Sequence, residues 1–146
     1  MTKAIWFDMD GVIADLYGVD NWLEYLINSD PYPYKAAEPL VDMRVLARLL
    51  NKLQSKGYYI GVVSWLSKNA TNEYNKAVTE AKLKWLNKHL HSVNWNEINI
   101  VPYGTPKHTA VSVKGILFDD EERNRKNWIG QAFDETRIFD VLGTLF

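Results

Sequence analysis

Trp6-Phe7-Asp8-Met9-Asp10-Gly11-Val12 is the stretch that decides how this sequence is interpreted. The apolar residues 4–7 have the composition of a short buried strand, and two carboxylates two residues apart follow it. Gly11 then predicts a tight turn. Binding and reacting side chains in α/β proteins lie at the carboxyl ends of the strands, so we expect Asp8 and Asp10 to belong to a functional site.

The length and composition describe one ordinary globular domain. The chain has 146 residues, of which 47% are hydrophobic and 24% charged, and this size predicts a single domain over residues 1–146. No apolar run approaches the roughly 20 residues of a membrane helix. Seventeen Lys and Arg residues against 18 Asp and Glu residues leave a net charge of −1. We therefore expect neither a nucleic-acid polymer nor a membrane as a partner.

Two further features of the sequence concern the cellular compartment of the protein and the kinds of catalysis and metal binding that it can support. The first strand begins so close to Met1 that a signal peptide has no room, which favours a cytoplasmic location. The sequence has no cysteine, and this excludes disulfides, thiol catalysis and cysteine-bound metals.

Apolar runs alternate with helical patterns along the chain. The helical patterns cover residues 43–53, residues 71–90 with Lys and Asn on the polar face, and a shorter segment after Asp120 that includes Trp128. Strands that alternate with helices in this way predict a doubly wound, Rossmann-like α/β fold with a five-stranded parallel sheet. The five expected strands are residues 4–7, 59–63, 98–101, 116–118 and 137–141.

The segment of about residues 12–40 interrupts this alternation and is interpreted as an insertion after the first strand. It contains a short helical pattern at residues 20–27, followed by three prolines that prevent a continuous helix. An insertion at the carboxyl edge of the sheet would lie over the site as a small helical cap. Tyr17, Tyr32 and Tyr34 are then candidates for substrate contact, with the last two in a proline-flanked loop; alternatively, the aromatic residues fill the insertion's own core.

The residues that follow the other predicted strands have the side chains that phosphoryl transfer requires. Alone, each has a plainer explanation, because aspartates cap turns and helices and a lone serine or lysine is commonly structural or solvated. Carboxylates that meet at one sheet edge repel one another unless a cation lies among them, and their hard oxygens suit Mg²⁺. The residues concerned are Asp8, Asp10, Ser64, Lys107, Asp119 and Asp120.

Charge suggests a division of work between the first two carboxylates. A carboxylate can attack phosphorus and form an aspartyl phosphate, provided that a metal and a lysine neutralise the phosphoryl oxygens. The two carboxylates then need different roles, so Asp8 can be the nucleophile while Asp10 protonates the leaving oxygen and later activates water. Ser64 would hydrogen-bond the phosphoryl group and Lys107 would balance its charge.

These motifs, in this order, resemble the four motifs of haloacid dehalogenase (HAD) phosphatases. Residues 106–111 (PKHTAV), 116–120 (ILFDD) and 81–90 (AKLKWLNKHL) look most like the 5′(3′)-deoxyribonucleotidases. The resemblance implies a HAD core with a small cap. It also implies these roles: Asp8 as nucleophile and Mg²⁺ ligand, Asp10 as general acid/base whose backbone carbonyl binds the metal, Ser64 and Lys107 as phosphate binders, and Asp119 and Asp120 as the remaining metal ligands.

The sequence departs from the family at two points. Trp65, which we place with the phosphate-binding residues by position, stands where family members often have a second hydroxyl, and Ser67 lies nearby. The insertion is also shorter than the helical cap of the animal enzymes. We expect a Mg²⁺-dependent phosphomonoesterase whose substrate is a small phosphorylated metabolite, with a nucleoside monophosphate favoured. The alternatives are a phosphatase for another small ester such as a sugar phosphate, a non-catalytic receiver-like phosphoacceptor, and a nucleotide-binding module.

Overall fold

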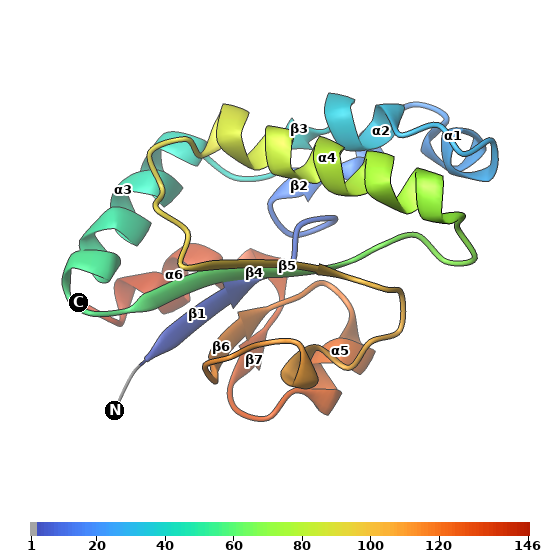
Figure 1. The fold of residues 1–146 in the computed structure, drawn as a ribbon. Helices are drawn as coiled ribbons and strands as arrows, with labels where there is room; N and C mark the ends of the chain where they lie inside the picture. The colour runs from blue at the N-terminus through green and yellow to red at the C-terminus, as the bar shows by residue number, and fades with distance from the viewer. Residues whose placement is uncertain (1–2) are drawn as a thin grey trace.

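The computed structural model describes residues 3–146 and contains a five-stranded parallel sheet (Figure 1). Its strand order is β5-β4-β1-β6-β7, with β1 in the centre. Phe7, at the end of β1, is level with Val62 on one neighbour and Phe118 on the other. The carboxyl ends of the three central strands therefore meet at one edge. The strands are β1 (Ala4–Phe7), β4 (Tyr59–Trp65), β5 (Glu97–Val101), β6 (Gly115–Phe118) and β7 (Ala132–Phe133).

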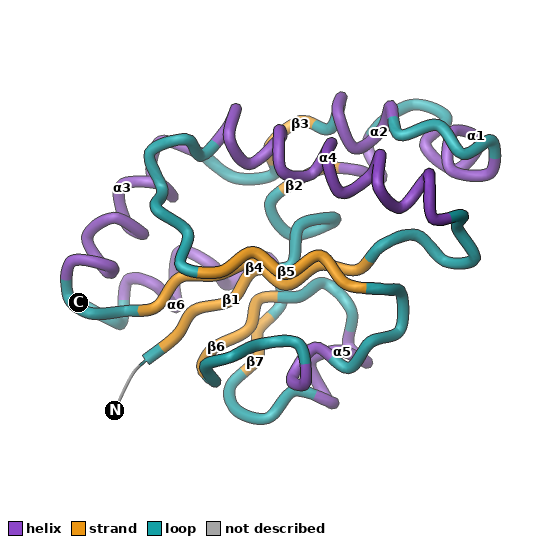
Figure 2. The backbone as a smooth tube through the Cα atoms, viewed as in Figure 1, coloured by secondary structure: helices purple, strands orange, loops and turns teal. Residues whose placement is uncertain are grey.

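Helices α3 (Met43–Ser55), α4 (Asn72–His89) and α6 (Ile138–Gly143) share the larger core with one face of the sheet (Figure 2). Ile5 and Phe7 point to this face because side chains alternate along β1. Buried residues from all three helices pack in the same cluster: Leu46, Leu50, Leu53, Trp85, Leu86, Ile138, Val141 and Leu142. The doubly wound α/β fold expected from the sequence is thus confirmed. Within residues 3–146, no helix combines the length and the apolar composition needed to span a bilayer.

The opposite face of the sheet has a thinner cover. Trp6 on this face packs with Leu117 and Trp128, beside the segment that connects β5 to β6 and contains the 3₁₀ helix η2 (Lys107–Thr109). Helix α5 (Glu122–Asn127) ends before Trp128, which has extended backbone angles. Our prediction that this helix includes Trp128 was therefore wrong; its indole N–H instead donates to Gly115 O at 2.9 Å.

The fifth strand was predicted in the wrong place. Residues 137–141 are not a strand: they span the end of a short 3₁₀ helix, η3 (Glu135–Arg137), and most of α6. Ile138, Val141 and Leu142 are the buried residues of α6 and have the i, i+3, i+4 spacing of a helix. A five-residue segment with three apolar residues does not distinguish a buried strand from a helix turn. The fifth strand of the sheet is instead β7, at the edge beside β6, whose two residues are too few to produce a sequence pattern.

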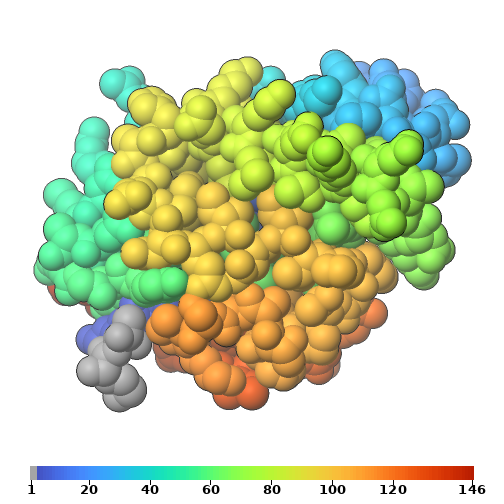
Figure 3. All heavy atoms as spheres, viewed as in Figure 1, coloured from blue at the N-terminus to red at the C-terminus, as the bar shows by residue number. Residues whose placement is uncertain are grey.

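The insertion forms a small layer above the carboxyl edge of the sheet. A two-stranded antiparallel ribbon, β2 (Ala14–Asp15) with β3 (Glu38–Pro39), closes its base. Between the ribbon strands lie η1 (Leu16–Gly18), α1 (Trp22–Ile27) and α2 (Tyr32–Ala36). Its atoms, coloured blue in Figure 3, form one surface with the yellow-green atoms of α4. Leu16 and Tyr34 share a core cluster with Tyr74, Val78 and Ala81 of α4, so the insertion is anchored on that helix.

The prediction that Tyr32 and Tyr34 lie in a loop was wrong, since both are in α2. The prolines do prevent one continuous helix, because α1 and α2 are separate. They do not prevent a short one. Pro31 is the N-cap and Pro33 lies in the first turn, where no backbone N–H is needed for a helical hydrogen bond.

Candidate active site

Asp8 directly follows β1, and the backbone around it is held by hydrogen bonds. Asp8 N donates to Phe118 O at 3.0 Å, which continues the ladder between β1 and β6. Asp8 Oδ1 accepts from Met9 N at 2.8 Å, and the Met9 carbonyl accepts from the backbone N–H groups of residues 12, 13 and 14. The chain thus makes a compact turn directly after β1, and the Met9 N–H fixes one oxygen of Asp8.

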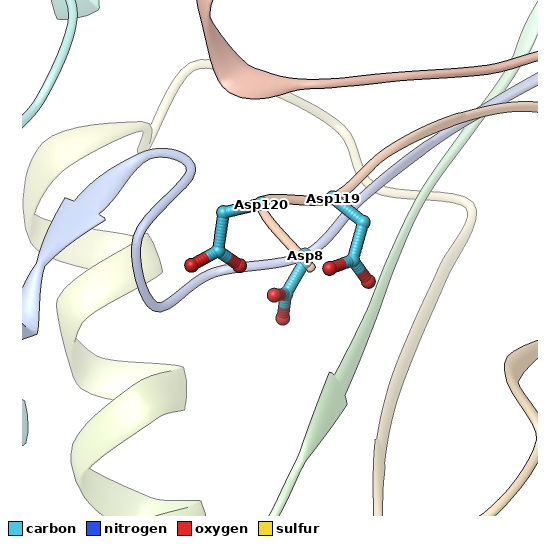
Figure 4. Close-up of side chains that lie close together, drawn as sticks. All are labelled: Asp8, Asp119 and Asp120. Atoms are coloured by element: carbon cyan, nitrogen blue, oxygen red, sulfur yellow. The ribbon is translucent and has the colours of Figure 1, made fainter. Parts of the chain in front are cut away.

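Asp119 and Asp120, which follow β6, bring two more carboxylates to Asp8 (Figure 4). One oxygen from each of the three lies within 4.8 Å of the others. Lys107 neutralises part of this charge, because its Nζ lies 2.6 Å from Asp119 Oδ2 and 3.2 Å from Asp8 Oδ1. Three converging carboxylates are hard oxygen ligands, so this donor set fits a Mg²⁺ ion. The side chains of Asp8, Asp119 and Asp120 would hold it.

Burial and mutual repulsion shift the pKa values of Asp119 and Asp120. Burial, followed by the negative charges of Asp8 and Asp119, raises the pKa of Asp120 to about 7. Burial and Asp8 likewise raise the pKa of Asp119, although Lys107 opposes this. A carboxylate whose pKa is near 7 is only partly ionised at neutral pH, so a divalent cation has to displace a proton to bind there.

Mg²⁺ binding should therefore depend on pH between 6 and 8. Because Asp120 has to lose its proton, we expect binding about tenfold weaker at pH 6 than at pH 8, with close to one proton released per ion at the lower pH. Isothermal titration calorimetry in two buffers of different ionisation enthalpy measures both quantities. Equal affinity at the two pH values would show that Asp120 is already ionised in the metal-free protein.

Gly11 allows the turn after Asp10 to approach the carboxylate of Asp120. Its φ is +81°, and a Cβ atom at this position would clash with the carboxylate of Asp120. We expect Gly11→Ala to weaken Mg²⁺ binding about tenfold and to lower the free energy of unfolding by about 1–3 kcal/mol. Calorimetry and thermal melts measure the two effects. Gly143→Ala is the control, since nothing lies within 4 Å of a Cβ there; loss in both variants would contradict the proposed clash.

Asp10 lies in a second polar cluster, next to the first. Its Oδ2 atom lies 3.0 Å from Lys82 Nζ, and the same ammonium group donates to Ser64 Oγ at 2.8 Å and to the Trp65 carbonyl at 2.7 Å. Burial is the main cause that raises the pKa of Asp10 and Asp8 adds to it, while Lys82 acts in the opposite direction. Asp8 and Asp10, which follow β1, therefore have separate lysine partners, Lys107 and Lys82. The metal role predicted for the backbone carbonyl of Asp10 stays a prediction.

Lys82 is the residue that the sequence prediction missed. We expected the lysines of this helix on its polar face, but Lys82 is 1% exposed and lies on the buried face. The signal was present in the spacing, because residue 82 is four positions after Val78 and three before Trp85. A lysine inside an apolar stripe has to find an anionic partner, here Asp10.

A cavity of about 220 Å³ opens above these two clusters. Asp8, Asp10, Lys107 and Asp120 are at its polar end, whereas the buried Ser64 is not among its lining residues in the described chain. Aromatic rings from the insertion and from the two strand-end loops form much of the remaining wall: Tyr17, Trp22, Tyr34, Trp65 and Tyr103.

The residues predicted to contact substrate from the cap, or to bind phosphate, do not all line this cavity. Tyr17 and Tyr34 line the cavity, and the hydroxyl of Tyr34 is 2.7 Å from Ser67 Oγ. Tyr32 does not line it; this side chain lies against Tyr25, beside a separate hollow, which corrects its prediction as a residue of this site. The indole N–H of Trp65 donates to Thr105 O at 2.7 Å, so its side chain offers the cavity an aromatic surface and no free donor.

Comparison with known proteins supports the fold and leaves the family open. No family model matches the chain, and no curated protein matches it. Among solved structures, the chain is similar to a D,D-heptose 1,7-bisphosphate phosphatase from Burkholderia thailandensis, with a TM-score of 0.54 and 14% identity. The alignment covers 96% of this chain and 97% of that one. At this identity the likeness establishes a common fold over the whole chain, and it gives no specific support to the resemblance to nucleotidases.

Proposed function

We propose that this protein is a Mg²⁺-dependent phosphoric monoester hydrolase of the HAD type. The observation that carries the proposal is the pairing of two lysine–aspartate clusters at one sheet edge: Lys107 with Asp8 and Asp119, and Lys82 with Asp10. The solved structure with the same fold has a phosphatase in its name, which agrees with this assignment. Asp8, Asp119 and Asp120 would hold Mg²⁺, which supplies positive charge against the phosphoryl oxygens.

The arrangement suits a covalent route through Asp8. Its Oδ1 atom is held by Met9 N and Lys107, while Oδ2 has no hydrogen-bond partner within residues 3–146 and is free to attack phosphorus. The new bond joins Asp8 Oδ2 to phosphorus as the bond from phosphorus to the leaving oxygen breaks, and Asp10 donates a proton to that oxygen. Asp10 then takes a proton from water, which attacks phosphorus and frees the Asp8 carboxylate with inorganic phosphate.

Lys107 is a cation that lines the cavity next to Asp8 and can reach the transferred group directly. It is 4% exposed. Two of its three N–H groups point at Asp8 and Asp119, and the third remains for a phosphoryl oxygen. The two carboxylates raise the pKa of Lys107 despite its burial, so the ammonium form persists at neutral pH.

Two substrate classes have support. The aromatic wall, with Trp65 and Tyr103 at 5.0 Å between ring centroids, offers surfaces for stacking a base and favours a nucleoside monophosphate. The heptose bisphosphate named for the solved structure favours a sugar phosphate. The cavity volume of about 220 Å³ limits either substrate to a small ester or to one that extends out of the mouth.

A phosphate-release assay over both classes tests the proposal. We expect hydrolysis of phenyl phosphate derivatives with Mg²⁺ and its loss in EDTA, followed by a clear preference within a panel of ribonucleotides, deoxyribonucleotides and sugar phosphates. Activity that persists in EDTA would exclude the metal-dependent mechanism. A protein that takes up phosphate from an acyl phosphate donor and never releases it would instead be a receiver-like phosphoacceptor.

A further inference from the structure

Lys82 is a buried ammonium group for which the four-motif scheme gives no role. It lies in the middle of α4, and its side chain is 1% exposed. Burying an unpaired ammonium costs several kcal/mol, so such a lysine persists only where its charge and its hydrogen-bond donors are matched. Its neighbours therefore indicate what it does.

All three N–H groups of Lys82 have partners in the site. They point at Asp10 Oδ2 at 3.0 Å, Ser64 Oγ at 2.8 Å and the Trp65 carbonyl at 2.7 Å. An ammonium group has three donors, so none remains for a substrate. Lys82 also does not line the cavity, in contrast to Lys107. The two lysines thus differ: Lys107 can contact the phosphoryl group, whereas Lys82 can act only through Asp10 and Ser64.

The hydrogen bond to Ser64 has a direct chemical consequence. Ser64 Oγ accepts from Lys82, and an ammonium cannot accept in return. In the described part of the chain the hydroxyl proton of Ser64 has no acceptor of its own. Lys82 therefore fixes the rotamer of Ser64. Because Ser64 is 1% exposed and does not line the cavity, its hydroxyl reaches a phosphoryl oxygen only if the residues between it and the cavity shift.

We propose that Lys82 is a positioning residue that holds the carboxyl group of Asp10 and the hydroxyl group of Ser64 in one geometry for phosphoryl transfer. The inference rests on the proposed function. Because Lys82 is on α4, which also anchors the insertion, the general acid is tied to the helix that supports the cavity wall. Misplacing a reacting group by about 1 Å can cost on the order of 100-fold in rate.

The first experiment compares Lys82→Met with the control Lys84→Met on the exposed face of the same helix. With a poor leaving group such as phenyl phosphate, we expect Lys82→Met to lower kcat about 10- to 100-fold. With 2,4-dinitrophenyl phosphate, whose leaving oxygen needs no protonation, the loss should shrink to a few fold. Equal losses for both esters would mean a general structural defect and would overturn the positioning role, as would an unchanged kcat.

The second experiment restores the ammonium chemically. The chain has no cysteine, so Lys82→Cys introduces its sole thiol. Alkylating this thiol with 2-bromoethylamine in denaturant and refolding the protein gives an aminoethyl side chain of nearly lysine length. We expect the aminoethylated protein to recover most of the kcat that Lys82→Cys loses. Refolded protein with a wild-type circular dichroism spectrum and no recovered kcat would contradict the inference.

Failure of the inference and failure of the proposed function have different signatures. A wild-type protein that hydrolyses no ester refutes the function, and inorganic phosphate then tests Lys82 without turnover. Binding of phosphate in the presence of Mg²⁺, followed by tryptophan fluorescence, should weaken severalfold in both Lys82→Met and Ser64→Ala. Weaker binding in both variants supports the link between Lys82 and Ser64, and unchanged binding in Lys82→Met overturns it.

Discussion

Replacement of Asp8 by asparagine is expected to lower kcat by on the order of 10⁴-fold or more, with the protein still folded. The amide keeps the size of the side chain and can accept from Met9 N and Lys107, as Asp8 Oδ1 does. It cannot supply the anionic Oδ2 atom that, in the proposed mechanism, attacks phosphorus. Steady-state phosphate release measures the loss, and thermal melts establish that the variant has the wild-type fold.

The covalent step has its own test. Acid quenching of the wild-type protein during turnover of a ³²P-labelled ester should trap label on the protein in a form that hydroxylamine releases, because an acyl phosphate is labile to that reagent. Asp140→Asn, at a carboxylate that is 79% exposed, is the matched control and should keep full activity. Undiminished turnover in Asp8→Asn would rule out Asp8 as the nucleophile and would point to direct attack by water.

The fold was predictable where apolar runs were long or bounded by clear signals. Strands β5, β4, β1 and β6 and helices α3 and α4 were located correctly to within a few residues. For α3, Leu46, Leu50 and Leu53 share one helical stripe, and Gly57 ends the helix with φ +97°. Strand β7 was missed because its two residues are too few to show a periodic pattern. The apolar run at residues 137–141 was assigned to it instead, although its buried residues have helical spacing.

The candidate site was predictable for the residues that follow the strands, but not for Lys82 on α4. Parallel topology alone brings Asp8, Ser64 and Asp119 to one edge, whatever the details of packing. The spacing of Lys82 from Val78 and Trp85 could place it on the buried face of α4, but only the tertiary packing brings that face to Asp10. Tyr32 was assigned to the site from its flanking prolines, but two residues are just over half a helical turn, so its side chain points to the side of α2 opposite that of Tyr34.

Removing the ammonium of Lys107 should affect stability and catalysis together. Lys107→Met leaves Asp8 and Asp119 buried beside Asp120 without their cation. Breaking a buried ion pair from one side costs about 3–5 kcal/mol, so we expect Tm in EDTA to fall by roughly 6–15 °C for a chain of this size. Because a donor to the phosphoryl group is also lost, kcat should fall about 10²- to 10³-fold.

Adding Mg²⁺ distinguishes the contribution of Lys107 to stability from its contribution to catalysis. An ion among the three carboxylates replaces much of the missing positive charge, so saturating Mg²⁺ should restore Tm toward that of the wild type while kcat stays low. Lys114→Met, at an exposed lysine on the same connection, should change neither. If Mg²⁺ left the Tm of Lys107→Met unchanged, the three carboxylates would not be its binding site. If the ion restored kcat as well, Lys107 would serve only to balance charge in the metal-free protein, and the contact to the phosphoryl group would have to come from another residue.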